Sequence, residues 1–325
     1  MRKTKRRSFL IAALFPAIAV ILFRTFPPIS ALWAAHIIRP CGMFLNRLTA
    51  KADFPIAEML SAAVAVLVPT GCLASLARSL AAGNLRPLTG WGLRVFSGLL
   101  AVIFAYVFLW YPAYWALIPE PATAPDVHHI AWLCKDLIES LNTSPLRFPT
   151  PEEVLDIASQ ISGIPDARVK AARYPEWMRR LHIAGLYVPW TGEAIVDPGA
   201  PPCALPFTAV HELMHLNATA DEGSTNIAAW EACKQAGGYF YDSARLWVLK
   251  YAMETLSEQD PDAAQALYAG MSPDLFRTFS CMNGRTAPAN RCLSILTAAL
   301  GLSYGTSSYP RLVNHLCTDR ESKTE

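Results

Sequence analysis

Residues 205–219 read LPFTAVHELMHLNAT and contain the pentapeptide HELMH at positions 211–215. In a helix, residues four apart lie on one face, so the imidazoles of His211 and His215 would point to the same side, with Glu212 the next residue round. The uncharged residues around the pentapeptide, and a proline near the start of the stretch, favour such a helix. The stretch therefore predicts a helix beneath a cleft, with two histidines and a glutamate available for chemistry.

Two histidines at this spacing can bind one metal ion, and the distance from zinc to a neutral imidazole nitrogen is about 2.0–2.1 Å. The ion lowers the pKa of a bound water toward about 7, and Glu212 can take the proton and return it to a leaving amine. The alternative is a pair of core histidines satisfied by hydrogen bonds. The surrounding residues favour one Zn²⁺ held by His211 and His215, and they point to metal-assisted hydrolysis.

A catalytic zinc site has three protein ligands and one open position. Glu222 is the carboxylate best placed as the third ligand if the chain turns after Ala218 and a new helix begins nearby. Asp221 is the rival acid. Asn226 would lie one turn after Glu222, where its amide can orient a ligand. An acid in a first helical turn is also favoured by the helix dipole, which is the structural alternative for Glu222.

The rest of the chain is too apolar for an ordinary soluble protein. Of its 325 residues, 53% are hydrophobic and 17% charged, with a net charge of +2 and a mean hydropathy of +0.25. Three unbroken apolar segments can cross a bilayer, the first barely, and they lie at about residues 8–23, 55–77 and 93–118. The composition therefore predicts a lipid bilayer as a partner.

The first apolar segment also resembles a signal peptide, but Arg24 follows it at once and no small-residue cleavage site is present, which favours an anchor. Residues 27–52 mix apolar and basic side chains and are expected to lie along the bilayer surface. The aromatic residues from Trp110 to Trp115 end the third segment as an interfacial belt. Residues 1–118 are therefore expected to form a membrane region.

Basic residues give the expected orientation. Eight lie at the N-terminus and between the second and third apolar segments, against five after the first and third. This bias places the N-terminus in the cytoplasm and residues 119–325 outside it, in a multi-pass protein of the cell membrane. Six of the eight cysteines lie in that outer part and can form disulfides, Cys281 with Cys292 being the first pair to test. Buried thiols are the alternative.

Residues 119–325 are long enough for one domain with its own core. Short strands are expected at Ala184–Pro189 and Glu193–Val196, on either side of a turn. The predicted fold is a mainly α membrane protein whose outer domain is mostly α (α+β), with a small sheet. Amphipathic patterns predict helices near 127–142, 151–162, 227–236, 240–258, 260–269, 273–280, 290–300 and 309–317.

Hydrolysis needs a group that stabilises the developing oxyanion, and Tyr187, Tyr309, Arg311 and His315 are the polar candidates. A role for the tyrosine or the arginine in bracing the last helix is the structural alternative. Glu193, in the turn between the two expected strands, either receives a substrate amine or fixes the hairpin.

Four segments resemble a bacterial family catalogued only as domain of unknown function 3810. The resemblance implies a membrane-bound, zincin-like domain in which His211, Glu212, His215 and Glu222 are the motif residues, and it brings no substrate. The arrangement is also similar to membrane-associated gluzincins, in which a glutamate on a following helix joins the two histidines. The segments are HIAGLYVPWTGEAIV (182–196), LPFTAVHELMH (205–215), DEGSTNIAAWEAC (221–233) and YAMETLSEQDPDAAQALYAGMSPDL (251–275).

Two positions depart from that family pattern. Relatives usually have a glycine soon after the second histidine, where this chain has Ala218, and glycine tolerates positive φ better than alanine. Relatives also tend to show a second acid where this chain has Ser224, which leaves Glu222 as the motif-matching acid.

The sequence thus predicts a membrane-anchored, zinc-dependent peptidase that acts on peptides or proteins and has no nucleic-acid partner. A metal-holding sensor or scaffold without turnover, and a zinc hydrolase of non-peptide amides, are the alternatives. The oligomeric state is left open.

Overall fold

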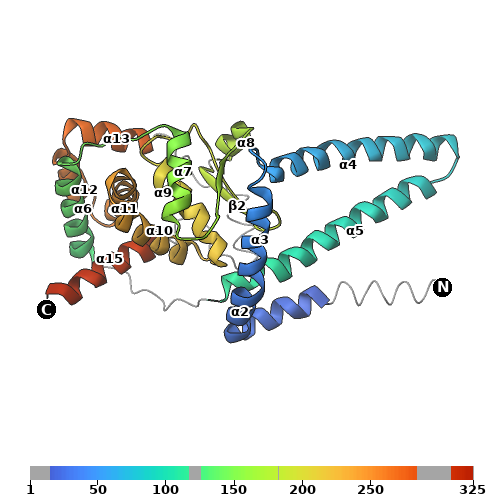
Figure 1. The fold of residues 1–325 in the computed structure, drawn as a ribbon, viewed down its shortest axis with the longest axis horizontal. Coiled ribbons are helices and arrows are strands. Elements are labelled where there is room, and N and C mark those ends of the chain that lie inside the picture. Colours follow the sequence, from blue (N-terminus) through green and yellow to red (C-terminus); the bar gives the residue numbers. More distant parts are fainter. Residues whose placement is uncertain (1–14, 117–125, 182, 284–308, 325) are drawn as a thin grey trace.

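The computed structural model describes residues 15–116, 126–181, 183–283 and 309–324. The described chain is mainly helical and contains one three-stranded sheet. In Figure 1 a long helical hairpin projects from a more rounded body that carries the sheet and most of the remaining helices.

The projecting hairpin consists of α4 (Ile56–Ala81) and α5 (Arg86–Leu109). Both helices are long and apolar enough to cross a membrane, and only 6% of the most apolar window of each is buried. This confirms that the second and third apolar segments are candidate spans, although α5 begins earlier and ends earlier than the sequence predicted. A third candidate arises if the bent pair Phe15–Thr25 and Pro27–Thr49 counts as one span.

The chain between the first helical segment and α4 runs across the direction of the hairpin (Figure 1). It comprises α2 (Pro27–Trp33), the π-helical turn η1 (Ala34–Ile38) and α3 (Arg39–Thr49). The bend before it is 108°. Proline at the second position of α3 has no backbone N–H to donate, which accounts for the wider turn just before it. The expectation that residues 27–52 lie along the bilayer surface stays a prediction.

The body is built from helices packed around a small sheet. Strand β3 (Glu193–Val196) is central, with β1 (Val169–Ala171) parallel to it on one side and β2 (Gly185–Val188) antiparallel on the other. Helix α9 (Leu205–Met214) packs on the sheet. The other elements are α6 (Val127–Asn142), α7 (Pro151–Ile161), α8 (Pro175–Arg180), α10 (Glu222–Ala236), α11 (Gly238–Gln259), α12 (Pro261–Ala269), α13 (Pro273–Asn283) and α15 (Tyr309–Thr324).

Most of these elements agree with the sequence expectations, but β1 and α8 were not predicted. Strand β1 has only three residues and α8 only six, so neither offers enough repeats for a period to be recognised. The helix expected near 290–300 and the thiol of Cys292 lie outside the described residues.

One buried core joins the N-terminal region to the body. The same cluster contains Ile38 from η1, Trp110 from the end of α5, Leu213 from α9 and Leu249 from α11. The helices with candidate membrane spans are therefore packed into the body rather than tethered to it by a linker.

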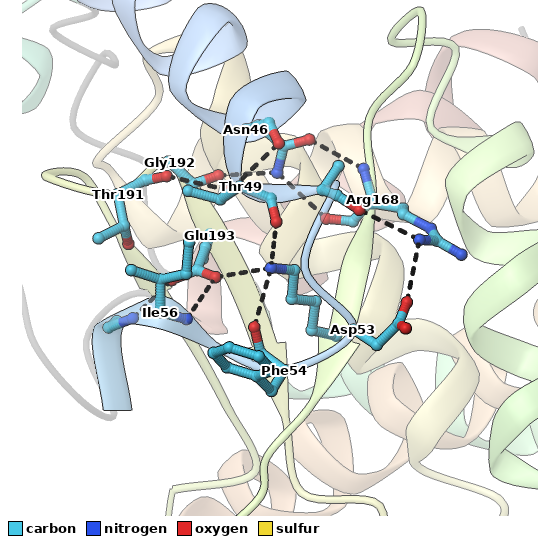
Figure 2. A network of polar contacts seen from close by, with 12 residues as sticks. Asn46, Thr49, Asp53, Phe54, Ile56, Arg168, Thr191, Gly192 and Glu193 are labelled. Atoms are coloured by element: carbon cyan, nitrogen blue, oxygen red, sulfur yellow. Dashed lines mark hydrogen bonds and ion pairs between the residues drawn. The ribbon is translucent and has the colours of Figure 1, made fainter. Parts of the chain in front are cut away.

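A buried ion pair fixes the start of α4 to the sheet (Figure 2). The Glu193 carboxylate accepts hydrogen bonds from the backbone N–H groups of Ile56 (2.8 Å) and Ala57 (2.7 Å) and from Lys170 Nζ (2.8 Å). Lys170 Nζ also donates to the carbonyl oxygens of Thr49 (2.6 Å) and Phe54 (3.1 Å). The side chains of Lys170 and Glu193 are 6% and 0% exposed, so every one of these charges and N–H groups depends on its partners.

Asn46 makes the neighbouring contact between α3 and the sheet. Its amide donates to the Gly192 carbonyl (2.7 Å) and accepts from the Arg168 N–H (2.9 Å). Gly192 has φ +64°, and a Cβ there would lie 2.6 Å from the Asn46 nitrogen, so this turn requires glycine for both its conformation and its close approach.

Replacing Glu193 by alanine is expected to lower the free energy of unfolding by about 3–5 kcal/mol, because it leaves the Lys170 ammonium buried and unpaired. Thermal unfolding in detergent micelles measures the change. The control is Asp53→Ala, which removes the partner of Arg168 in a pair 51% and 98% exposed, with an expected loss of about 0.5 kcal/mol or less. Equal losses for the two variants would contradict the assignment.

Candidate metal centre

The candidate metal centre lies where α9 ends and α10 begins. His211 and Glu212 belong to the last turn of α9, His215 opens the short 3-10 turn η3 (His215–Asn217), and Glu222 is the first residue of α10. Apart from His211, whose side chain is 12% exposed, α9 is buried along its length, as its apolar sequence requires.

Ala218 makes the reversal between these helices possible. It ends η3 with φ 59° and ψ 37°, in the left-handed region, and its N–H donates to the His215 carbonyl (3.1 Å). The turn expected after Ala218 is therefore present. Its left-handed backbone conformation costs alanine more conformational energy than it would cost glycine.

Asp221 and Arg311 hold the first turn of α10. Asp221 is the N-cap and accepts hydrogen bonds from both the N–H and the hydroxyl of Ser224 (2.8 Å each). Arg311 Nη1, from α15, contacts both Asp221 oxygens at 2.8 and 2.7 Å. Ser224 thus donates twice to the residue that caps α10.

The distances among the three ligand candidates fit one ion. Glu222 Oε2 lies 3.0 Å from His211 Nε2, and Glu222 Oε1 lies 3.8 Å from His215 Nε2. One ligand atom from each residue lies within 4.8 Å of the other two. Two tetrahedral zinc ligands at 2.0–2.1 Å from the ion would be about 3.4 Å apart, which falls between the two observed separations.

A hydrogen bond orients the His215 imidazole. His215 Nδ1 lies 2.6 Å from the Thr219 carbonyl, which can only accept, so this nitrogen carries the proton and Nε2 is left for the ion. Asn226 contributes, after Glu222 and Glu212, to the raised pKa of His211, and its orienting role stays a prediction. Among the described residues, Asn226 Nδ2 and His211 Nδ1 are buried polar atoms without a hydrogen-bond partner.

Burial and the Glu222 charge set the electrostatics. Burial lowers the pKa of His211, but the hydrogen bond and charge of Glu222 outweigh it and raise that pKa above its ordinary value. Burial dominates at His215 and lowers its pKa. Burial also opposes ionisation of Glu222, but the two imidazoles outweigh it and lower the pKa of Glu222. One negatively charged carboxylate and two imidazoles are a common set of ligands for a divalent cation such as zinc.

Glu212 lies between α9 and strand β2. Its side chain abuts Gly185, where a Cβ would come within 2.4 Å of Glu212 Oε1, so glycine at this position makes room for the carboxylate. Burial raises the pKa of Glu212 to about 8, although a hydrogen bond from the Tyr187 backbone lowers it somewhat. A carboxyl group that titrates near neutral pH can both accept and return a proton.

Aromatic rings pack around His215. The Tyr187 ring stacks on it with centroids 5.9 Å apart, and the Trp110 ring meets it edge-on at 6.0 Å. Trp110 and Tyr187 are themselves 5.0 Å apart. Sequence reasoning assigned Trp110 to a membrane belt and missed its contact with a metal-ligand candidate, because nothing in the sequence pairs residue 110 with residue 215.

The remaining predicted site residues lie in different places. Glu193 is buried against α4 and not beside the histidines, and Arg311 is paired with Asp221. His315 is exposed on α15. Tyr309 begins α15, and its side chain lies outside the described residues. The structure thus brings His211, His215 and Glu222 together, with Glu212, Asn226 and Tyr187 beside them.

Fold and site define a class: a mainly helical protein with two or three candidate membrane helices and a His-His-Glu group that can hold a metal ion. The chain belongs to the family described as Protein of unknown function (DUF3810), whose model matches residues 35–287. The match spans α3, α4, α5 and the whole metal centre. No curated protein and no solved structure matches the chain.

Replacing Ala218 by glycine is expected to raise the free energy of unfolding by about 1 kcal/mol, because it relieves a left-handed alanine. The control is Ala228→Gly on the exposed face of α10, where the same change is expected to lower it by about 1 kcal/mol. Thermal unfolding compares the two. Destabilisation by both variants would argue against strain at Ala218.

Zinc affinity is expected to fall as the pH falls. Because the pKa of His211 is raised, the metal-free site holds a proton at pH values where an ordinary histidine has lost it, and zinc must displace that proton. Below that pKa the affinity should decrease by about tenfold per pH unit for each displaced proton. Competition with a chromogenic chelator between about pH 5.5 and 8 measures this. A flat profile would mean that the imidazoles do not bind the ion.

Proposed function

We propose that this protein is a membrane-anchored, zinc-dependent metallopeptidase, with His211, His215 and Glu222 as metal ligands and Glu212 as the general base and acid. The observation that carries the proposal is the convergence of two imidazoles and one carboxylate within 4.8 Å, directly beside a buried glutamate whose pKa is raised to about 8.

The chain's own groups account for the proton transfers. A bound zinc ion supplies Lewis-acid chemistry, which polarises a carbonyl and lowers the pKa of a water molecule. Glu212 accepts the proton of the attacking water and donates it to the leaving amine. The Thr219 carbonyl holds the His215 imidazole in place, and Asp221 with Arg311 holds the helix that begins with Glu222.

Strand β2 supports a peptide as the substrate. Its register with β3 pairs Leu186 with Ile195 and Val188 with Glu193, and the Asp197 N–H donates to the Ala184 carbonyl (2.9 Å). In an antiparallel ladder the intervening residues, Gly185 and Tyr187, then direct their N–H and C=O groups to the other edge. That edge adjoins Glu212, so an extended peptide paired there would lie along the metal centre.

The proposed location is the cell membrane, with the metal centre outside the cytoplasm. The α4–α5 link, which carries Arg78 and Arg86 at its ends, lies at the far end of the hairpin from the metal centre (Figure 1). Positively charged links favour the cytoplasmic side, so the body would lie on the opposite side.

Glu212→Gln tests the proposed chemistry, because glutamine keeps the shape of the side chain and cannot take up a proton. The variant is expected to keep one zinc ion per chain and to lose at least about 10²-fold in peptide cleavage. Metal analysis and a peptide-library cleavage assay provide the two readouts, and Glu231→Gln on the exposed face of α10 is the control. Zinc retention without cleavage by the unmodified protein would favour a metal-holding scaffold instead.

A further inference from the structure

The metal centre is built against the end of a candidate membrane helix. Trp110 follows the last residue of α5, and its ring packs on His215 and Tyr187 with centroid separations of 6.0 and 5.0 Å. Helix α3 also contacts this region, since a Cβ on Gly42 would come within 2.9 Å of the Tyr187 hydroxyl. A metal-ligand candidate and the edge strand thus share their packing with the N-terminal region.

The length of α5 places this end at the surface of a bilayer. Its 24 residues measure about 36 Å at 1.5 Å per residue, and the hydrocarbon core of a bilayer is about 30 Å thick. Trp110 therefore reaches the interfacial layer, the depth at which tryptophan is preferred. Because the Trp110 ring packs on His215, an α5 that spans a bilayer would hold the candidate metal centre next to the lipid surface.

A groove connects the exposed apolar face of α5 with the hairpin that carries β2. Its walls are Ala101, Val102 and Ala105 on α5 and Trp190 in the β2–β3 turn, and its volume is about 280 Å³. Val102 and Trp190 are 54% and 43% exposed, so the groove opens outward. The two alanines leave room for the backbone of a second helix to approach closely, as small residues do in membranes.

We propose, resting on the peptidase function above, that the substrates are membrane-spanning proteins cut at a peptide bond close to the outer lipid surface. The spanning helix of the substrate docks in the groove beside Ala101 and Ala105. The chain that leaves the bilayer then passes Trp190 and pairs with the edge of β2 that adjoins Glu212, which brings its first extended residues to that carboxyl group.

The test compares one peptide segment in two forms, with the full-length protein reconstituted in lipid vesicles. A randomised segment is attached to a polyleucine spanning helix, or it is supplied free in solution. We expect cleavage of the attached form to be about tenfold faster or more, because the bilayer raises its effective concentration at the site. Cuts should fall within about ten residues of the anchor, a reach of about 33 Å for extended chain. Mass spectrometry identifies the cut positions.

Two variants on the same turn of α5 test the groove. Val102→Trp fills the groove with a larger side chain. The control is Ile103→Trp, because Ile103 is 41% exposed and lies about 150° around the helix from the centre of the groove. Val102→Trp is expected to remove the roughly tenfold advantage of the attached segment, with zinc content and cleavage of the free segment unchanged. Ile103→Trp should leave all three unchanged.

The outcomes separate this inference from the proposed function. Equal cleavage of the attached and free segments, or cuts scattered along the attached one, would overturn the substrate class. An unchanged advantage in Val102→Trp would overturn the groove as its docking place. Failure of the zinc-loaded protein to cut either form would remove the peptidase function itself.

Discussion

The buried ion pair between Lys170 and Glu193 is the contact on which the relation of α4 to the body depends. Glu193 caps the first turn of α4, and its partner lysine reaches across to the chain just before that helix. A charge pair with almost no solvent exposure tolerates no sliding of one surface over the other, because any shift leaves a charge or an N–H group without a partner. The sheet is therefore held in register with the N-terminal helices, and α9 packs directly on that sheet.

The metal centre in turn depends on how α10 begins. Three groups fix this point: the left-handed Ala218, the Asp221 cap, and Arg311 from the last helix. They bring Glu222 back to α9 within a few residues of His215, against the tendency of alanine to avoid positive φ. Helix α15 thus contributes to the candidate metal centre through the contact of Arg311 with Asp221, which positions Glu222.

Much of this centre could be predicted from the sequence because its signals are local. The spacing of His211 and His215 on a helix, and an acid at the start of the next helix, follow from a 3.6-residue period and from capping rules. The candidate spans are recognisable from composition alone. Contacts between segments far apart in the sequence leave no periodic pattern in it. Only the fold therefore reveals three of them: the partners of Glu193, the pairing of Arg311 with Asp221, and the packing of Trp110 on His215.

The position of Trp110 would couple the candidate metal site to the lipid wherever α5 spans a bilayer. A helix longer than the local hydrocarbon thickness tilts, and α5 is longer than an average bilayer requires. Tilting α5 moves the indole that follows it, and that indole rests against His215. In an α5 that spans a bilayer, a change from thin to thick membranes would reach the His215 imidazole through this single ring, and acyl-chain length would then act on the candidate metal site without any soluble effector.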